Sequence, residues 1–213
     1  DPGGKVAFAT VGTTMPAGFD IGERKLRGVE SRGMICSEDE LGIGPDSDGI
    51  IILSADLRVG KPLADEVPGI EDTIIEISVT PNRPDALGHL GVARDVAAKL
   101  GRELRRPPVF GADEAQALPV VEKLVTIEAG ERCGRYHGYT LEGASIGASP
   151  LHLRVRLHRL GLRPINNAVD ITNFCLMEYG QPMHAFDRAR LNEGRVVVRF
   201  AQAGRKMTTL DGQ

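Results

Sequence analysis

The sequence predicts an α+β fold in which a partial, small β-barrel is followed by a helix-containing linker and an α/β portion. Short apolar runs separated by glycine fill residues 5–79, and glycine permits the bends that a small barrel needs. Near residues 86–100 the apolar spacing changes from that of strands to that of a helix. Residues 105–119 have linker composition. The predicted parts are therefore residues 1–79, 80–119 and 120–213.

Three segments of the first part are expected to be strands. KVAFATVG, residues 5–12, alternates apolar and small residues, and GIIILS, residues 49–54, is a short apolar run. DTIIEISVT, residues 72–80, is expected to form a further strand. Short strands bounded by glycine favour a small barrel over a flat sheet.

A helix is expected over residues 86–100. Pro81 and Pro84 keep the preceding chain extended, because the residue before a proline is disfavoured in the α region. Asp85 is the expected N-cap, and Gly101 follows the last residue with helical apolar spacing. This helix is expected to join the two larger parts of the chain.

The last part is expected to contain strands and two helices. LVTIEA (124–129), RYHGYTLEG (135–143) and RVVVRFA (195–201) are expected strands, the last one buried. One helix follows Ser149-Pro150 and ends at Gly161. Its expected inward residues are Leu151, Val155 and those of 157–160 other than Arg159, with Arg154, Arg156 and Arg159 largely outward. Asp170 is the expected cap of a second helix, which Gly180 ends.

Composition limits the classes of function. Hydrophobic residues make up 41% and charged residues 26% of the chain, as in ordinary globular proteins, and no apolar run is long enough to span a bilayer. Residues 1–79 carry 7 Lys/Arg against 15 Asp/Glu, whereas residues 80–213 carry 19 against 14. Aromatic residues are 4%, which argues against base stacking as the main mode of nucleic-acid binding. The three scattered cysteines indicate reduced thiols in a cytoplasmic protein and no zinc site.

Residues 165–187, INNAVDITNFCLMEYGQPMHAFD, combine an apolar framework with small polar side chains and one histidine. A buried helix does not need so many polar groups, and a surface loop would not carry so many apolar ones. The mixture is typical of a pocket for a small molecule.

Three segments together resemble the β chain of bacterial phenylalanyl-tRNA synthetases. They are KLRGVESRGMICSEDELGIG (25–44), SVTPNRPDALGHLGVARDVAAKLG (78–101) and LGLRPINNAVDITNFCLMEYGQPMHAFD (160–187). The resemblance implies the end of an oligonucleotide-fold tRNA-binding barrel, a joining segment and the start of an editing domain. It covers nearly the whole chain but only a part of the family's β chain. The aspartate at residue 1, in place of methionine, agrees with the expectation that the chain is a piece of a longer protein.

The resemblance implies an enzyme of two α and two β chains that joins phenylalanine to its tRNA. ATP and Mg²⁺ serve the whole enzyme, and no cofactor or metal is expected in this segment. The α chain would carry the synthetic site, and the β chain would carry a second site that hydrolyses tyrosine from mischarged tRNA.

The resemblance also implies roles for individual residues. His184 is the expected catalytic residue of editing, and the expected substrate-binding residues are Arg163, Thr172 and Asn173. Each has a structural alternative: a loop hydrogen bond for His184, a helix C-terminal cation for Arg163, and helix capping for Thr172 and Asn173, which fits Thr172 better. The expected tRNA-binding residues are Lys25, Arg27 and Arg32, whose alternative is a solvated barrel rim. The acid that reads the tyrosine hydroxyl is expected beyond Gln213.

Some nearby residues are expected to have no chemical role. Asn166 and Asn167 are expected to be turn residues, and Cys175 has no base beside it in the sequence. Two other interpretations stay open. The chain would be a stand-alone tRNA-binding module without hydrolytic activity, or a scaffold for an α chain.

Overall fold

The computed structural model describes residues 3–108, 124–206 and 208. The chain forms two compact units: Asp1–Leu104 with Ile146–His184, and Arg105–Ser145 with Ala185–Gln213. The predicted division at residues 79 and 119 follows the order of the chain, whereas the first unit takes in a later segment. That division stays a prediction. Most of the predicted linker, residues 109–119, lies outside the described residues.

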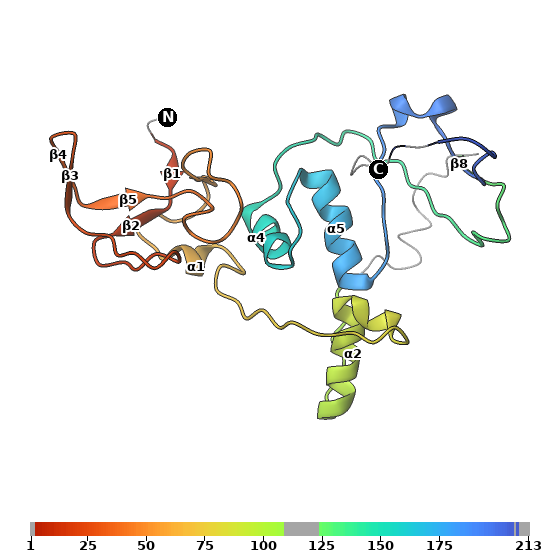
Figure 1. Ribbon diagram of the computed structural model, residues 1–213, viewed down its shortest axis with the longest axis horizontal. Helices are drawn as coiled ribbons and strands as arrows, with labels where there is room; N and C mark the ends of the chain where they lie inside the picture. Colours follow the sequence, from red (N-terminus) through yellow and green to blue (C-terminus); the bar gives the residue numbers. More distant parts are fainter. Residues whose placement is uncertain (1–2, 109–123, 207, 209–213) are drawn as a thin grey trace. The chain divides into compact units, whose positions relative to one another are not determined.

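The strands near the N-terminus pair in three antiparallel sheets of two strands each (Figure 1). The pairs are β1 (Lys5–Val6) with β6 (Ile52–Leu53), β2 (Phe8–Thr10) with β5 (Gly33–Ile35), and β3 (Arg24–Leu26) with β4 (Val29–Ser31). β1, β2 and β6 confirm strands predicted within residues 5–12 and 49–54. No closed barrel is present in the described ranges, and the partial oligonucleotide-fold barrel stays a prediction.

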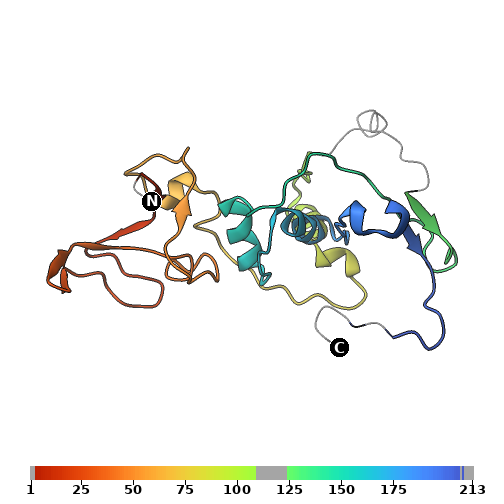
Figure 2. The ribbon, with the colours of Figure 1, turned by 90° about the horizontal axis from the view of Figure 1, so that it is seen from above.

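The hairpin of β3 and β4 turns through Arg27 and Gly28. Both residues have positive φ angles, 50° and 87°. A two-residue hairpin loop with two positive φ angles matches the right-handed twist of the strands, and glycine adopts this conformation without steric cost. The hairpin lies at one end of the N-terminal strands (Figure 2).

Two apolar clusters form the core of this region. One contains Ala9, Met15, Ile21 and Cys36. The other joins Ala7, Ile43 and Ile51 to Val155, a residue from a helix about one hundred positions later in the chain. The first unit is therefore held together by contacts between distant segments.

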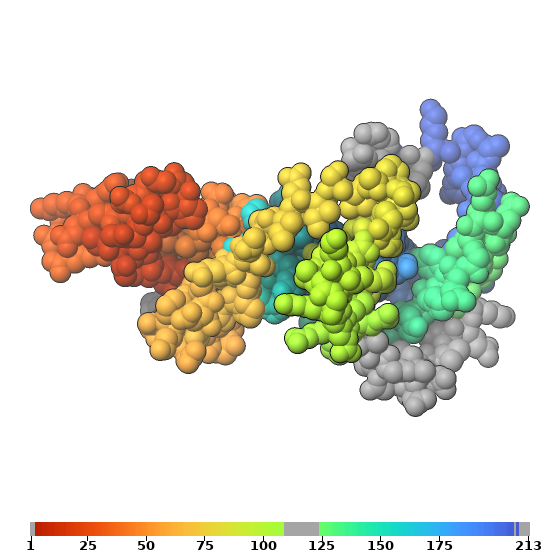
Figure 3. Space-filling model, turned by 90° about the horizontal axis from the view of Figure 1, so that it is seen from below, coloured from red at the N-terminus to blue at the C-terminus, as the bar shows by residue number. Residues whose placement is uncertain are grey.

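The strand predicted over residues 72–80 is absent from the structure. This segment pairs with no strand in the described part of the chain, and Ile74, Ile75 and Ile77 are exposed. It runs along the surface, in gold and yellow, in the space-filling view (Figure 3). The apolar pattern alone was insufficient to predict a strand, because a strand also needs a neighbouring strand for its backbone hydrogen bonds.

The helix predicted near residues 86–100 is confirmed, but its predicted cap is wrong. A 3₁₀ turn, η1 (Pro84–Leu87), precedes α2 (His89–Leu100), and Gly101 ends α2 with a left-handed φ of 61°. Asp85 does not cap α2, because Gly88 is the N-cap residue and Asp85 lies within η1. Its carboxylate instead accepts two hydrogen bonds of 3.0 Å from Arg83. Arg83 also donates to Asp95 within α2 at 2.8 Å.

Both later helices are confirmed. They are α4 (Leu151–Arg159) and α5 (Asn167–Tyr179), and Gly161 and Gly180 follow them with positive φ. Val155 and Leu157 of α4 are fully buried as predicted. The prediction that Arg154 and Arg159 point outward is wrong, since Arg154 pairs with Glu38 and Arg159 donates to the carbonyl of Ile70. Each guanidinium finds a partner in the N-terminal part of the chain. The first unit also contains the one-turn helix α1 (Leu63–Glu66).

Among its described residues, the second unit is built around a pair of parallel strands. β7 (Val125–Ile127) pairs with β8 (Val196–Val198), and Val125 lies opposite Val196. These strands confirm the predictions at 124–129 and 195–201, although β8 is half-buried rather than buried. Two 3₁₀ turns, η2 (Arg188–Arg190) and η3 (Asn192–Gly194), precede β8. Residues 135–143 form no strand, because no other described strand pairs with them. None of the described helices is long and apolar enough to cross a membrane.

Candidate functional site

The helix α5 begins at an asparagine cap. The Asn166 side chain accepts a hydrogen bond from the Val169 N–H at 3.1 Å, so this residue is the N-cap. Thr172 and Asn173 follow about two turns later and are half-buried. The Thr172 hydroxyl donates to the Val169 carbonyl at 2.7 Å. Its proton is used inside the helix, and its oxygen can still accept a hydrogen bond.

The predicted cap, Asp170, has a different role. Its side chain is fully buried. It accepts hydrogen bonds from the Ser149 hydroxyl at 2.5 Å and from the Ile165 N–H at 2.8 Å. Asp170 therefore ties three segments together: the start of α4, the loop before α5, and α5 itself. The cap prediction was wrong because Asn166 precedes Asp170 and takes that role.

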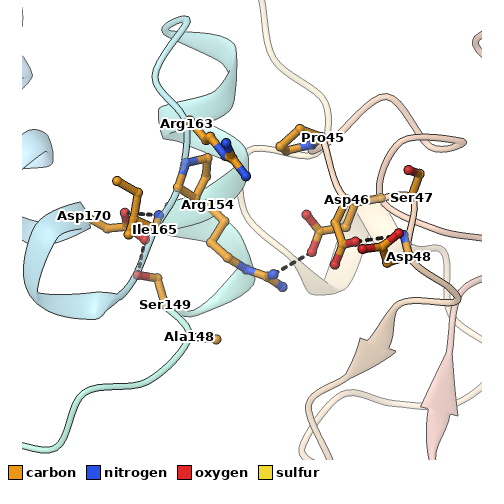
Figure 4. A pocket seen from close by; sticks show the side chains of 12 residues that line it. Pro45, Asp46, Ser47, Asp48, Ala148, Ser149, Arg154, Arg163, Ile165 and Asp170 are labelled. Atoms are coloured by element: carbon orange, nitrogen blue, oxygen red, sulfur yellow. Dashed lines mark hydrogen bonds and ion pairs between the residues drawn. The ribbon is translucent and has the colours of Figure 1, made fainter. Parts of the chain in front are cut away.

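A pocket of about 510 Å³ lies in the first unit beside this joint (Figure 4). One wall comes from the loop of residues 45–48, and the opposite wall comes from α4 and the loop before α5. Arg163 enters it from that second wall. The lining residues are Glu38, Pro45, Asp46, Ser47, Asp48, Ala148, Ser149, Arg154, Arg163, Pro164, Ile165 and Asp170.

The charges of the pocket decide which ligands suit it. Arg154 is engaged with Glu38 through a 2.6 Å contact between Nη1 and Oε1. Arg163 faces a wall that carries Asp46 and Asp48 (Figure 4). Four carboxylates and two guanidiniums line the pocket, so its net charge disfavours a phosphate group. The pocket is a polar joint between segments and is poorly matched to an RNA backbone.

The pocket brings together only one of the four residues predicted for the editing site. Arg163 lines it, whereas Thr172, Asn173 and His184 are absent from its lining. His184 is exposed and lies five residues beyond Tyr179, the last residue of α5. The predicted convergence of these four side chains on one ligand stays a prediction.

The predicted tRNA-binding residues lie on or next to the β3–β4 hairpin. Lys25 is in β3 opposite Glu30, and Arg27 is in the turn. Arg32, which follows β4, lies 3.8 Å from Glu23 and 3.8 Å from Glu30. Two glutamates thus offset the charge of Arg32. The positive charge of Arg27, at the tip of the hairpin, is more accessible than that of Arg32.

The Cys175 thiol shows no sign of nucleophilic activation. Burial raises the pKa of the Cys175 thiol, and the charge of Glu178 raises it further. A raised pKa keeps the thiol protonated and unreactive. Within the described residues, no three His, Cys, Asp or Glu side chains gather as ligands for a metal ion.

Sequence reasoning missed the roles of Asp170, Arg154 and Glu38. A carboxylate in an apolar helix segment, and arginines among the buried leucines and valines of α4, were the available signals. Asp170 and its partner Ser149 are 21 residues apart in the sequence, and Arg154 and Glu38 are 116 residues apart. Local sequence patterns do not reveal such distant pairs.

Comparison with known proteins first identifies a domain family within the chain. The B3/4 domain matches residues 132–213. This range includes α4, α5, the Asp170 joint and the loop that carries His184.

Individual relatives are more specific. The phenylalanine–tRNA ligase beta subunit of Geobacter metallireducens is 49% identical over 214 residues, which cover 99% of this chain and 26% of the relative. The subunit of Syntrophotalea carbinolica is 50% identical over 212 residues, with 98% and 26% covered. That of Pectobacterium atrosepticum is 47% identical over 210 residues, with 98% and 26% covered. This chain thus spans about a quarter of the length of these curated relatives, and its similarity to them confirms the resemblance predicted from the three segments.

Proposed function

We propose that this chain forms part of the β subunit of a phenylalanine–tRNA ligase, where it contributes tRNA binding and hydrolytic editing of tyrosyl-tRNA. The observation that carries this proposal is the similarity to such subunits along 98–99% of the chain. An α chain is the implied partner, in a heterotetramer of two α and two β chains in the cytoplasm. The synthetic site belongs to the α chain.

Editing compensates for the limited selectivity of the synthetic site for phenylalanine over tyrosine. Tyrosine differs from phenylalanine by one hydroxyl group, and an apolar pocket rejects an added hydroxyl only by about a hundredfold. A second site that hydrogen-bonds the hydroxyl discriminates by about 10⁴ or more. A hydrolytic site on the β chain can therefore remove the product that the synthetic site fails to exclude.

The chemistry needs little from the protein beyond positioning. An aminoacyl ester is already activated, so a placed water molecule and a stabilised oxyanion suffice without a protein nucleophile. The protonated state favoured for Cys175 agrees with this mechanism. His184 is the proposed group that orders the water or contacts the ester, and Arg163, Thr172 and Asn173 are the proposed substrate-binding residues.

ATP and Mg²⁺ are assigned to the complete enzyme rather than to this segment. The acidic lining of the pocket disfavours a nucleoside triphosphate. No step of editing in this chain requires either group.

The decisive experiment measures two reactions of one variant. In the complete enzyme, His184→Ala should slow tyrosyl-tRNA deacylation about a hundredfold, since losing one positioned hydrogen bond to a developing charge costs ~3 kcal/mol. Phenylalanine activation, measured by ATP–pyrophosphate exchange, should stay near normal. His152→Ala is the matched control, because His152 is an exposed histidine of α4. Unchanged deacylation in His184→Ala would favour a tRNA-binding module or a scaffold.

A further inference from the structure

The backbone of α5 comes close to Gly88, the residue that precedes α2. A Cβ atom at Gly88 would lie 2.8 Å from the Gly180 nitrogen, 3.2 Å from the Tyr179 carbonyl carbon and 3.3 Å from the Gly180 Cα. All three are backbone atoms, which cannot rotate away as a flexible side chain can. Real side chains do not tolerate contacts of this kind without displacement of one segment.

Space rather than conformation explains the glycine at this position. Gly88 has φ −121° and ψ 157°, an extended conformation that every L-residue adopts. Gly101 and Gly180 differ, because their φ angles of 61° and 75° are left-handed. Gly88 is therefore the glycine whose missing side chain sets how closely α2 and α5 approach.

The contact lies where α5 gives way to the loop that carries His184. Gly180 ends α5, and its N–H donates to the Leu176 carbonyl at 2.8 Å. His184 follows only four residues later. The end of α5 meets the beginning of α2 (Figure 1), so a shift at this contact would change the starting point of the loop.

The elements on either side of Gly88, η1 and α2, are held together by close contacts. Arg83 bridges Asp85 in η1 and Asp95 in α2. Gly91 lies so close to η1 that a Cβ atom there would be 1.7 Å from the Asp85 carbonyl oxygen. The segment of η1 and α2, which the sequence predicts only as a link between domains, thus packs compactly and contacts the end of α5.

From this geometry we infer that Gly88 is a positioning residue for His184 in the editing reaction. It acts by letting α2 contact the backbone of Tyr179 and Gly180, which fixes the point from which residues 181–184 depart. This inference rests on the proposed editing function and gives the α2 segment a role in it.

The test uses the complete enzyme with substitutions in its β chain. Gly88→Ala should lower the rate constant of tyrosyl-tRNA deacylation about tenfold or more, because displacement of a catalytic group by about 1 Å costs up to ~10²-fold. Phenylalanine aminoacylation should change less than about twofold. Val155→Ala is the destabilising control: it opens the buried cluster around α4 and should leave deacylation nearly unchanged below its melting temperature. Gly22→Ala, where a Cβ meets nothing within 4 Å, is the neutral control.

A double-mutant cycle separates positioning from general damage. If Gly88 acts through His184, then Gly88→Ala should have almost no further effect in the His184→Ala enzyme. A full, additive effect in that background would overturn the inference and leave the editing function intact. Equal loss of deacylation and aminoacylation in Gly88→Ala would also overturn it. An unaltered rate in His184→Ala alone would overturn both the inference and the proposed editing role.

Discussion

Asp170 connects three segments of the α4–α5 region. Its carboxylate is fully buried and has two donors from different segments, Ser149 and Ile165. A buried carboxylate is tolerated only when hydrogen bonds replace its lost hydration. Because Arg163 lies two residues before Ile165, Asp170 also fixes the part of the loop that places Arg163 in the pocket.

Replacement of Asp170 should therefore destabilise the protein strongly. Asp170→Ala leaves two donors without a partner, and each buried unsatisfied group costs ~1–3 kcal/mol. For a protein of this size the melting temperature should fall by roughly 5–15 °C, measured by thermal unfolding. Asp170→Asn retains one acceptor oxygen and should lose about half as much. Equal stability of Asp170→Ala and the unaltered protein would contradict the role of this joint.

Cys36 gives a pH-dependent prediction. Burial raises the pKa of its thiol, and the charge of Glu40 raises it further. The thiol therefore ionises more readily in the unfolded chain, so the free energy of unfolding should fall as the pH rises above the ordinary thiol range near ~8.5. At pH 8, iodoacetamide should modify Cys36 only as fast as the protein opens, whereas half-buried Cys133 reacts sooner. Mass spectrometry of modified peptides distinguishes the two, and rapid modification of Cys36 would show that the site is open.

At the residue scale, the glycines that end helices were predictable from the sequence, but the hydrogen-bond partners of the carboxylates were not. Gly101, Gly161 and Gly180 were recognised as helix ends because left-handed glycine is a local signal. Asp85 and Asp170 were both assigned as caps, but Asp85 accepts hydrogen bonds from Arg83, two residues earlier, and Asp170 accepts one from Ser149, 21 residues earlier. A cap depends on three neighbouring residues, whereas a buried carboxylate takes whichever donor the tertiary fold supplies.

The helix α4 is attached to the N-terminal strands by both apolar and polar contacts. Val155 belongs to the cluster of Ala7, Ile43 and Ile51. Arg154 pairs with Glu38, whose side chain is only 6% exposed. An ion pair with one buried partner is costly to break, because the remaining charge stays desolvated.

Arg154→Ala should therefore cost more than removal of a neighbouring arginine. We expect a loss of about 1–3 kcal/mol, less than for a fully buried pair because Arg154 is 23% exposed. Arg156→Ala, which removes an exposed guanidinium 5.8 Å from the Phe174 ring, should cost about 0.5–1 kcal/mol. Urea unfolding measures both. Adding Glu38→Gln to Arg154→Ala should recover part of the loss, and no recovery would mean that the two side chains are not coupled.

The β3–β4 hairpin gives a prediction about RNA. If the hairpin contacts phosphates, Lys25→Ala and Arg27→Ala should each lower the slope of log Kd against log salt by about one phosphate contact. Arg32→Ala should change it less, because Glu23 and Glu30 already offset this charge. Filter binding of tRNA at several salt concentrations checks the order. A larger effect for Arg32 than for Arg27 would contradict the assignment.

At the scale of elements, helices were predicted better than strands. The spacing of apolar residues and the terminal glycines located α2, α4 and α5, because a helix satisfies its backbone hydrogen bonds within one segment. The segments 72–80 and 135–143 have strand-like composition but no described partner. Strand formation depends on a second segment, and the sequence of the first cannot supply that information.

At the scale of the whole molecule, the compact units do not follow the order of the chain. The B3/4 match covers residues 132–213, and these residues contribute to both units. Thr172, Asn173 and His184 all belong to the first unit, together with the N-terminal strands and α2. The candidate editing residues are therefore built into the same unit as the hairpin that is proposed to bind tRNA.

Net charge should make RNA binding by the 213-residue chain weak and dependent on salt. The chain carries −3 overall, and its first 79 residues carry 7 Lys/Arg against 15 Asp/Glu, so long-range attraction of a polyanion is small. Two or three phosphate contacts at the hairpin would leave an affinity that falls about ten- to fortyfold between 50 and 200 mM salt. Titration of labelled tRNA at these two concentrations measures the change, with the Lys25→Ala, Arg27→Ala chain as the control. Tight binding that salt does not weaken would require contacts other than phosphate pairing, and the low aromatic content of 4% leaves stacking poorly placed to supply them.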